Sequence, residues 1–192
     1  MSLKNSATSW GSVSKWLHWL IAALILLLGI VGLTMGELPR TPKYFWVYTA
    51  HKSLGITVLA LVVARIAWRV YAGAPTPVAG TPGWQHRLAS LTHWLLYVLI
   101  IALPLSGWLY DSANGLRPFK LFGLVEMPKL IAPDEAAALT SHTVHEWGFW
   151  LLICVVLAHA GAALYHHLIA GDATLARMLP AGWVKRPQKE VA

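Results

Sequence analysis

The sequence has 192 residues, of which 57% are hydrophobic and 12% are charged, with a formal net charge of +7. A mean hydropathy of +0.56 is too high for one soluble globular domain, so we expect much of the surface to contact lipid. Cys154 is the only cysteine, which excludes an intrachain disulfide, a thiolate metal cluster and a C-x-x-C-H attachment site.

Four apolar segments approach the length of about 20 residues that a membrane-spanning helix needs. We expect spans at about residues 16–36, 48–70, 90–111 and 143–168. The first is longer than the apolar core of a signal peptide, and no cleavage site follows it, so it is interpreted as a helix. The predicted fold class is all-α, a transmembrane four-helix bundle that forms one domain over residues 1–192.

The connections between the spans contain turn residues. "GELPRTPK" follows the first span, "AGAPTPVAGTPG" follows the second, and residues 111–142 form a longer third connection. Within the third connection, "APDEAAAL" predicts a short surface helix that is capped by Asp134. His86 and His142 are expected in loops and are assigned no role.

Basic residues indicate the orientation. Four spans place both termini on one side, and that side has nine of the lysines and arginines against six on the other. The positive-inside rule therefore predicts cytoplasmic termini. The same asymmetry accounts for the net charge, so a nucleic-acid partner is not invoked. The tryptophans at the span ends are typical of an interfacial belt.

Four histidines fall into two pairs by helical position. His145 and His159 are 14 residues apart, nearly four helical turns, so they share one face of the fourth span with about 21 Å of rise between them. His18 begins the first span at the inner side, and His51 begins the second span at the outer side. We therefore expect His18 to pair with His159, and His51 with His145.

Two histidines from facing helices at each of two depths suit a planar cofactor with imidazole nitrogen on both sides of its metal. Zinc normally takes four protein ligands, or three with an open position, within a few ångströms. The spread along the fourth span does not supply such a cluster, and two sites of two histidines would each be under-ligated. The alternative for each histidine alone is a hydrated residue near a span end.

Gly55 and Arg65 are placed near the predicted ligands. Gly55 lies four residues after His51 and would leave room for a macrocycle, although glycine is also common at ordinary helix contacts in membranes. Arg65 lies on the same face as His51, 14 residues further on. It could pair with an acidic group of the cofactor, or extend to the interface as a span-end arginine.

Five segments resemble the bacterial cytochrome b561 family, short four-helix dihaem membrane proteins related to the cytochrome b subunits of nickel-iron hydrogenases. They are "SKWLHWLIA", "YTAHKSLGI", "THWLLYVLIIALPLSGW", "TVHEWGFW" and "LAHAGAALYHHLIAGDATLARMLP", and the resemblance covers about residues 12–180. It implies two haem b groups with His18, His51, His145 and His159 as the axial ligands. It also implies electron transfer between a donor at one side of the bacterial inner membrane and ubiquinone.

A member of this short type oxidises superoxide while it reduces ubiquinone, which makes superoxide or another periplasmic donor the expected partner. A quinone site needs polar groups that bind and protonate its oxygens. We expect His166 in that role first and His93 second, with His167 on the surface. Lys52, Arg117 and Lys120 are candidates to attract an anionic substrate, although nearby acidic residues oppose them.

Three classes of function are compatible with these residues. The first is a stand-alone superoxide:quinone oxidoreductase. The second is an electron-transfer subunit that anchors a soluble dehydrogenase or hydrogenase. The third is a histidine-lined metal or proton transporter without haem, which would be colourless. The sequence leaves the oligomeric state, the haem potentials and the natural donor open.

Overall fold

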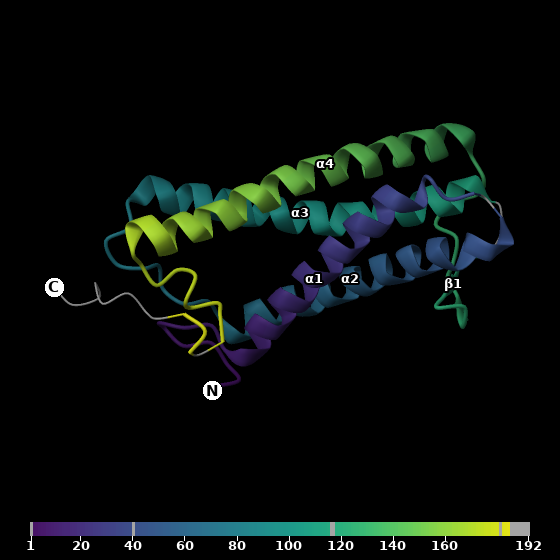
Figure 1. The fold of residues 1–192 in the computed structure, drawn as a ribbon. Helices are drawn as coiled ribbons and strands as arrows, with labels where there is room; N and C mark the ends of the chain where they lie inside the picture. Colours follow the sequence, from purple (N-terminus) through teal and green to yellow (C-terminus); the bar gives the residue numbers. More distant parts are fainter. Residues whose placement is uncertain (1, 40, 116–117, 181, 185–192) are drawn as a thin grey trace. The chain divides into compact units, whose positions relative to one another are not determined.

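The computed structural model describes residues 2–39, 41–115, 118–180 and 182–184. Its long elements are four helices: α1 (Ser12–Met35), α2 (Phe45–Ala72), α3 (Gly83–Asn114) and α4 (Glu135–Tyr165) (Figure 1). All four are long and apolar enough to cross a membrane. The predicted fold class, an all-α transmembrane four-helix bundle, is confirmed.

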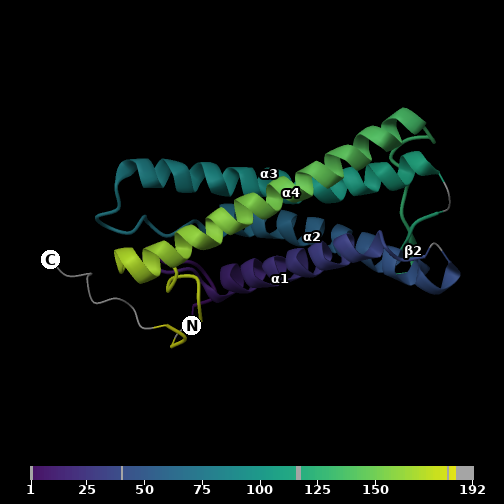
Figure 2. The same ribbon diagram turned by 45° about the horizontal axis from the view of Figure 1, so that its top comes forward.

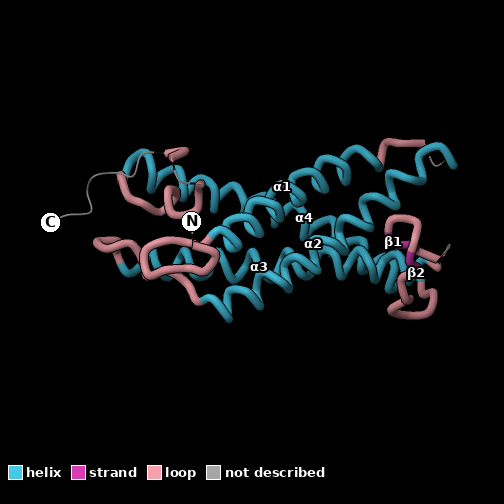
Figure 3. The backbone as a smooth tube through the Cα atoms, turned by 90° about the horizontal axis from the view of Figure 1, so that it is seen from below, coloured by secondary structure: helices cyan, strands magenta, loops and turns pink. Residues whose placement is uncertain are grey.

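Short elements lie between and after the helices (Figure 3). A 3-10 turn, η1 (Pro42–Tyr44), precedes α2, and a π-helical turn, η2 (His166–Ala170), follows α4. Strands β1 (Lys120–Leu121) and β2 (Val125–Glu126) pair antiparallel in a small hairpin, with Lys120 opposite Glu126. Gly171 ends η2 in the left-handed conformation, with φ of 65°, which glycine adopts at no steric cost.

The predicted separate surface helix in the third connection is wrong. Asp134 instead caps α4 itself, because its Oδ1 accepts a hydrogen bond of 2.8 Å from the backbone N–H of Ala137. An acidic cap with Glu135 in the first turn stabilises a helix N-terminus, so the alanine-rich segment continues into the span without a break.

The helices also extend past the predicted apolar spans at their polar ends. α3 begins at Gly83 and α4 at Glu135, so His86 and His142 lie in helices, and their predicted placement in loops is wrong. Hydropathy marks the part of a helix that crosses the hydrocarbon, whereas the backbone hydrogen bonds continue into polar residues beyond it.

The chain divides into two compact units. Each of the four helices that Figures 1 and 2 draw contributes a segment to both units. Unit 1 consists of Met1–Trp19, Ala64–Tyr97 and Ile153–Ala192. Unit 2 consists of Leu20–Val63 and Val98–Leu152. Each unit contains one of the two predicted histidine pairs, so each pair is described within its own unit.

Unit 2 has its core between the helix segments and under the hairpin. Val62 is fully buried, and Val58 and Leu152 are nearly so. The hairpin is held to α2 by Ser53, whose buried hydroxyl accepts a 2.8 Å hydrogen bond from the backbone N–H of Phe122. This bond fixes the hairpin over the beginning of α2, next to His51.

Unit 1 is held together by bonds from its terminal segments. The backbone N–H of Thr76 donates to the carbonyl of Ala7 over 2.9 Å. The buried Arg177 donates from Nη1 to the carbonyl of Thr76 over 2.8 Å. Trp19 donates from Nε1 to the carbonyl of Met178 over 3.1 Å. The residues after η2 are therefore joined to the N-terminal part of the chain.

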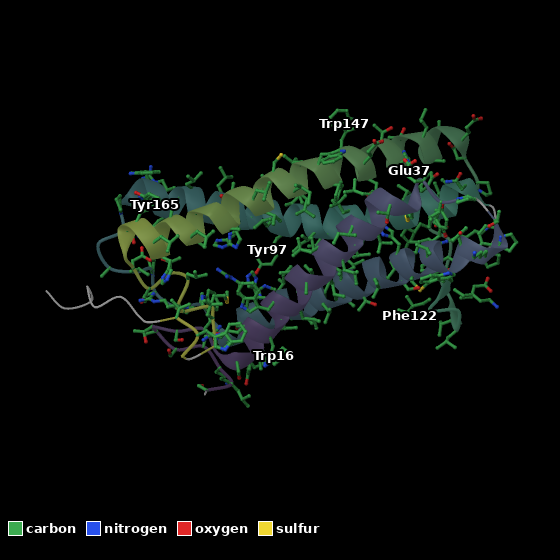
Figure 4. The ribbon with its side chains drawn as sticks, viewed as in Figure 1. Trp16, Glu37, Tyr97, Phe122, Trp147 and Tyr165 are labelled. Carbon is green, nitrogen blue, oxygen red and sulfur yellow. The ribbon has the colours of Figure 1, made fainter. Side chains whose placement is uncertain are left out.

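The apolar side chains of the helices mostly face outward. Only 6–17% of the most apolar stretch of each helix is buried inside the protein. Trp16 is 76% exposed and Trp147 is 70% exposed, and both point away from the helices that carry them (Figure 4). Since such a surface is unfavourable in water, these faces are the ones that lipid covers.

Candidate haem-binding site

The rings of His51 and His145 face each other in unit 2. His51 comes from the first part of α2 and His145 from α4, and their ring centroids are 6.2 Å apart with an interplanar angle of 75°. Both side chains are partly buried. The structure therefore brings together the pair that helical spacing selected.

The ring of His145 is fixed by α3. Its Nδ1 lies 2.9 Å from the carbonyl oxygen of Leu103 and 3.1 Å from the hydroxyl of Ser106. Because a carbonyl oxygen only accepts hydrogen bonds, Nδ1 must carry the proton, which leaves the lone pair of Nε2 free for a metal. Gly107 permits this approach, since a Cβ there would lie 3.1 Å from His145 Cε1.

The ring of His51 has a different environment. It lies against α1, where a Cβ added to Gly32 would be 3.3 Å from His51 Cε1. Its Nδ1 is buried, and among the described residues it has no hydrogen-bond partner. A buried polar atom without a partner is costly, and such an atom is often explained by a missing ligand.

A cavity of about 400 Å³ opens beside these two rings within unit 2. Its wall is mostly apolar and includes four glycines, and a Cβ added to Gly55 would meet nothing within 4 Å. The volume lies in the range of about 300–1,000 Å³ that is usual for small-molecule and cofactor pockets. The lining glycines are Gly29, Gly32, Gly36 and Gly55.

The rings of His18 and His159 face each other in unit 1 with nearly the same geometry. Their centroids are 6.2 Å apart and their planes meet at 76°. A third imidazole is adjacent, since the ring centroid of His93 on α3 lies 5.2 Å from that of His159. His93 therefore lies beside the predicted inner ligand.

Arg65 supplies positive charge near the His18–His159 pair. Its Nη1 donates to the carbonyl of Ser14 over 2.9 Å, which holds the side chain against α1. Its charge is close enough to act on both His18 and His159. A partly buried cation beside two imidazoles favours an anionic group in the same site.

His166 is bonded to a carboxylate at the end of α4. Its Nδ1 lies 2.5 Å from Oδ2 of Asp172, and both side chains are 17% exposed. The other oxygen, Oδ1, accepts a 2.8 Å hydrogen bond from the backbone N–H of Thr174. Burial opposes the charge of Asp172, but these hydrogen bonds outweigh it and lower the pKa of the carboxyl below its ordinary value of 3.8.

The predicted cationic residues are partly neutralised. Lys52 forms a 2.8 Å ion pair with Asp111 and lies over the ring of Phe119, 4.8 Å from its centroid. Lys120 is exposed and lies opposite Glu126 in the hairpin. Arg117 lies outside the described residues. The acidic neighbours reduce the field that Lys52 and Lys120 produce.

Comparisons with known proteins give the family of this chain. The family model for prokaryotic cytochrome b561 matches residues 9–181. The chain belongs to the prokaryotic cytochrome b561 family. It is 33% identical to "Cytochrome b561 homolog 2" of Escherichia coli strain K12 over 184 residues, which is 93% of this chain and 95% of that protein.

Two further relatives have similar coverage. "Cytochrome b561 homolog 1" of Escherichia coli strain K12 is 31% identical over 86% of this chain and 93% of its own length. "Probable superoxide oxidase CybB" of Yersinia pestis is 32% identical over 85% of this chain and 92% of its own length. Membership of the cytochrome b561 family implies membrane electron transfer and the binding of haem b.

The residues of both pairs fit the haem b of a cytochrome b561. A metal–imidazole bond is about 2 Å long, so two rings on opposite sides of one ion have centres roughly 6 Å apart. Both pairs have ring centroids 6.2 Å apart. Among the described residues, no group of three or more His, Cys, Asp or Glu could hold a metal ion. Two protein ligands suit an iron whose other positions a porphyrin fills.

Sequence reasoning missed several residues that shape this cytochrome b561 site. Gly29 and Gly32 in α1, and Gly36 directly after it, follow a helical i, i+3, i+7 spacing, and that spacing was a detectable signal. Ser106 and Gly107 contact the ring of His145 from another helix. No sequence pattern marked these two residues, because their role depends on the packing of α3 against α4.

Proposed function

We propose that this protein is a dihaem b-type cytochrome that carries single electrons from superoxide to the ubiquinone pool. In this proposal His18 and His159 are the axial ligands of one haem, and His51 and His145 are those of the other. The observation that carries it is the recurrence of one ring geometry, with centroids 6.2 Å apart, in two separate units of the chain.

The proposed orientation follows from the basic residues of the sequence. Both termini lie in the cytoplasm and the helices cross the bacterial inner membrane. The His51–His145 pair is then near the periplasmic side, and the His18–His159 pair is near the cytoplasmic side.

The proposed reaction balances with two superoxide anions for each quinone. Each superoxide loses one electron and becomes dioxygen, and the two electrons together with two protons convert one ubiquinone to ubiquinol. The haem irons supply one-electron redox chemistry when they are bound. The relative named as a probable superoxide oxidase supports this choice of donor.

His166 is proposed to bind and protonate the quinone. The carboxylate of Asp172 accepts the Nδ1 proton of His166, which leaves Nε2 for a quinone oxygen. A protonated imidazole can donate from Nε2, and Asp172 stabilises its positive charge. His93 is the second proposed quinone contact, and it lies beside His159, 5.2 Å between ring centroids.

Lys52, Arg117 and Lys120 are the cations proposed to attract superoxide. Exposed positive charge near an entrance raises the local concentration of a small anion. Lys120 is the exposed member among the described residues, whereas Lys52 is paired with Asp111. We therefore assign the larger part of the attraction to Lys120.

A haem count on the unmodified protein tests the proposal first. Purified full-length protein should contain two haem b per chain by the pyridine haemochrome assay, with low-spin spectra typical of two imidazole ligands. Mixing this protein with superoxide and a soluble ubiquinone analogue should then produce ubiquinol. One haem or none per chain would contradict the proposed haem ligation. Two haems per chain without formation of ubiquinol would contradict the proposed reaction.

A second candidate is an electron-transfer subunit that anchors a soluble dehydrogenase. The hairpin favours it, because Phe122, which Figure 4 labels, is 54% exposed, and Leu124 and Val125 are 83% and 62% exposed. An exposed apolar patch outside the candidate spans is typical of an interaction surface. Purification that always yields a stoichiometric partner protein, without quinone reduction by the chain alone, would favour this candidate.

A further inference from the structure

Ser106 makes a polar contact with a ring nitrogen of a predicted haem ligand. It lies on α3, is 8% exposed, and places its hydroxyl oxygen 3.1 Å from Nδ1 of His145. The same hydroxyl lies 2.8 Å from the carbonyl oxygen of Leu103, which is itself 2.9 Å from Nδ1. The three groups therefore form one closed set of hydrogen bonds.

The direction of each bond in this set is determined by its chemistry. The carbonyl of Leu103 only accepts, so it must receive a hydrogen from both neighbours. The Ser106 hydroxyl uses its single hydrogen on that carbonyl, in the back-bond to residue i−3 that serine makes in helices. The oxygen of Ser106 therefore accepts a hydrogen bond from the Nδ1–H of His145. This N–H is shared between two acceptors, the Ser106 hydroxyl and the Leu103 carbonyl.

The other ring of the same pair has no such bonds. Nδ1 of His51 is buried and has no hydrogen-bond partner among the described residues. Among the described residues, hydrogen bonds that change the electron-donating strength of this pair of imidazoles therefore act through His145. Since the Leu103 acceptor belongs to the backbone, Ser106 is the part of this set that a side-chain substitution can change.

We propose that Ser106 is a positioning residue that lowers the reduction potential of the haem held by His51 and His145. This inference rests on the haem ligation proposed above. An acceptor on the far nitrogen makes an axial imidazole more basic, and a more basic ligand stabilises oxidised iron relative to reduced iron. Ser106 would in this way separate the potential of this haem from that of the haem on His18 and His159.

The test is a potentiometric redox titration of the full-length, haem-loaded protein in detergent, with Ser106→Ala. We expect the equilibrium constant for reduction of one haem to rise three- to tenfold. A tenfold rise corresponds to an increase of about 59 mV in the reduction potential of a one-electron couple. The second haem should keep its potential. Electron paramagnetic resonance of the oxidised protein should show a change at one low-spin haem only.

Two further variants separate tuning from packing. Ser106→Thr keeps the hydroxyl and should keep the potential of the unmodified protein. Ser141→Ala is the matched control, because Ser141 is also buried in unit 2 but its hydroxyl bonds to the carbonyls of Ala137 and Ala138 in its own helix. This control should leave both potentials unchanged.

The other outcomes distinguish failure of this proposal from failure of the haem ligation on which it rests. Two haems with an unchanged potential in Ser106→Ala, or an equal shift in Ser141→Ala, would overturn it. If Ser106→Ala does not fold, Ser106→Cys replaces the oxygen with a weaker acceptor and should shift the potential in the same direction. If His145→Ala keeps both haems, the proposed ligation has failed instead, and the count shows this before any titration.

Discussion

The imidazole of His145 lies directly against Gly107 of α3: a Cβ added to this glycine would be 3.1 Å from Cε1 and 3.3 Å from Nδ1 of the ring. If alanine replaced Gly107, contacts this short would force the His145 ring to move by a few tenths of an ångström. The ring cannot move far without losing the carbonyl of Leu103, 2.9 Å from its Nδ1. Gly107 therefore fixes the distance between α3 and this ring.

Gly107→Ala should weaken haem binding at the His51–His145 pair. We expect fewer than two haems per chain after purification, measured by the pyridine haemochrome assay. The helix propensity of alanine is more favourable than that of glycine by about 1 kcal/mol, so destabilisation of α3 would not explain a loss of haem. Gly83→Ala on the same helix is the control, since a Cβ there meets nothing within 4 Å. Full haem content with an unchanged spectrum in Gly107→Ala would contradict this prediction.

Single ligand substitutions should each remove one haem. His159→Ala should lose the haem held with His18, and His51→Ala should lose the haem held with His145. The haem count should fall from two to one in both variants, and redox titration should show a different remaining potential in each. His86→Ala is the control, because His86 lies on α3 outside both pairs. A count of two in either ligand variant would refute that ligand assignment.

Lys120→Gln should slow the reaction with superoxide in a salt-dependent way. At low ionic strength we expect a severalfold lower second-order rate constant, because an exposed cation attracts the anionic substrate. Near 1 M salt the Debye length falls to about 3 Å, and the two proteins should react at equal rates. Lys4→Gln in unit 1 should behave like the unmodified protein. Stopped-flow absorbance at several salt concentrations measures these rates, and equal rates at low salt would remove Lys120 from the proposal.

Asp172→Asn should lower thermal stability in a pH-dependent way. Although burial opposes its charge, hydrogen bonds from Thr174 and His166 lower the pKa of the carboxyl below 3.8. A lowered pKa in the folded state adds stability above pH 3.8, and that stability is lost as the pH falls through the lowered value. Tm should therefore differ by about 2–4 °C at pH 6, and the difference should shrink below pH 3.8.

Thermal unfolding followed by circular dichroism in detergent checks the Asp172 prediction. The exposed loop residue Glu37 provides the control, because Glu37→Gln removes a carboxylate without removing a bond of this kind. A difference between the unmodified protein and Asp172→Asn that stays constant from pH 6 to pH 3 would show that the carboxylate charge is not responsible.

The sequence was sufficient for the spans and for the membership of each histidine pair. Hydropathy over about 20 residues locates a spanning helix, and 3.6 residues per turn assign each histidine to a face and a depth. His51 and His145 were matched by this arithmetic alone, and the structure brings their rings to 6.2 Å. The polar helix ends were misplaced, because the cap at Asp134 lies nine residues before residue 143, where the apolar part of α4 was predicted to begin.

Only the tertiary structure decided how each side chain is bonded. The Leu103 carbonyl and Ser106 reach His145 from α3 across 42 and 39 residues of sequence, and Lys52 meets Asp111 across 59. Such contacts depend on how far each helix is rotated and shifted against its neighbour, which side-chain packing sets and helical periodicity does not. Periodicity within one helix thus predicted which residues share a face, whereas packing between helices determined the proton position on His145 and the charge balance around Lys52.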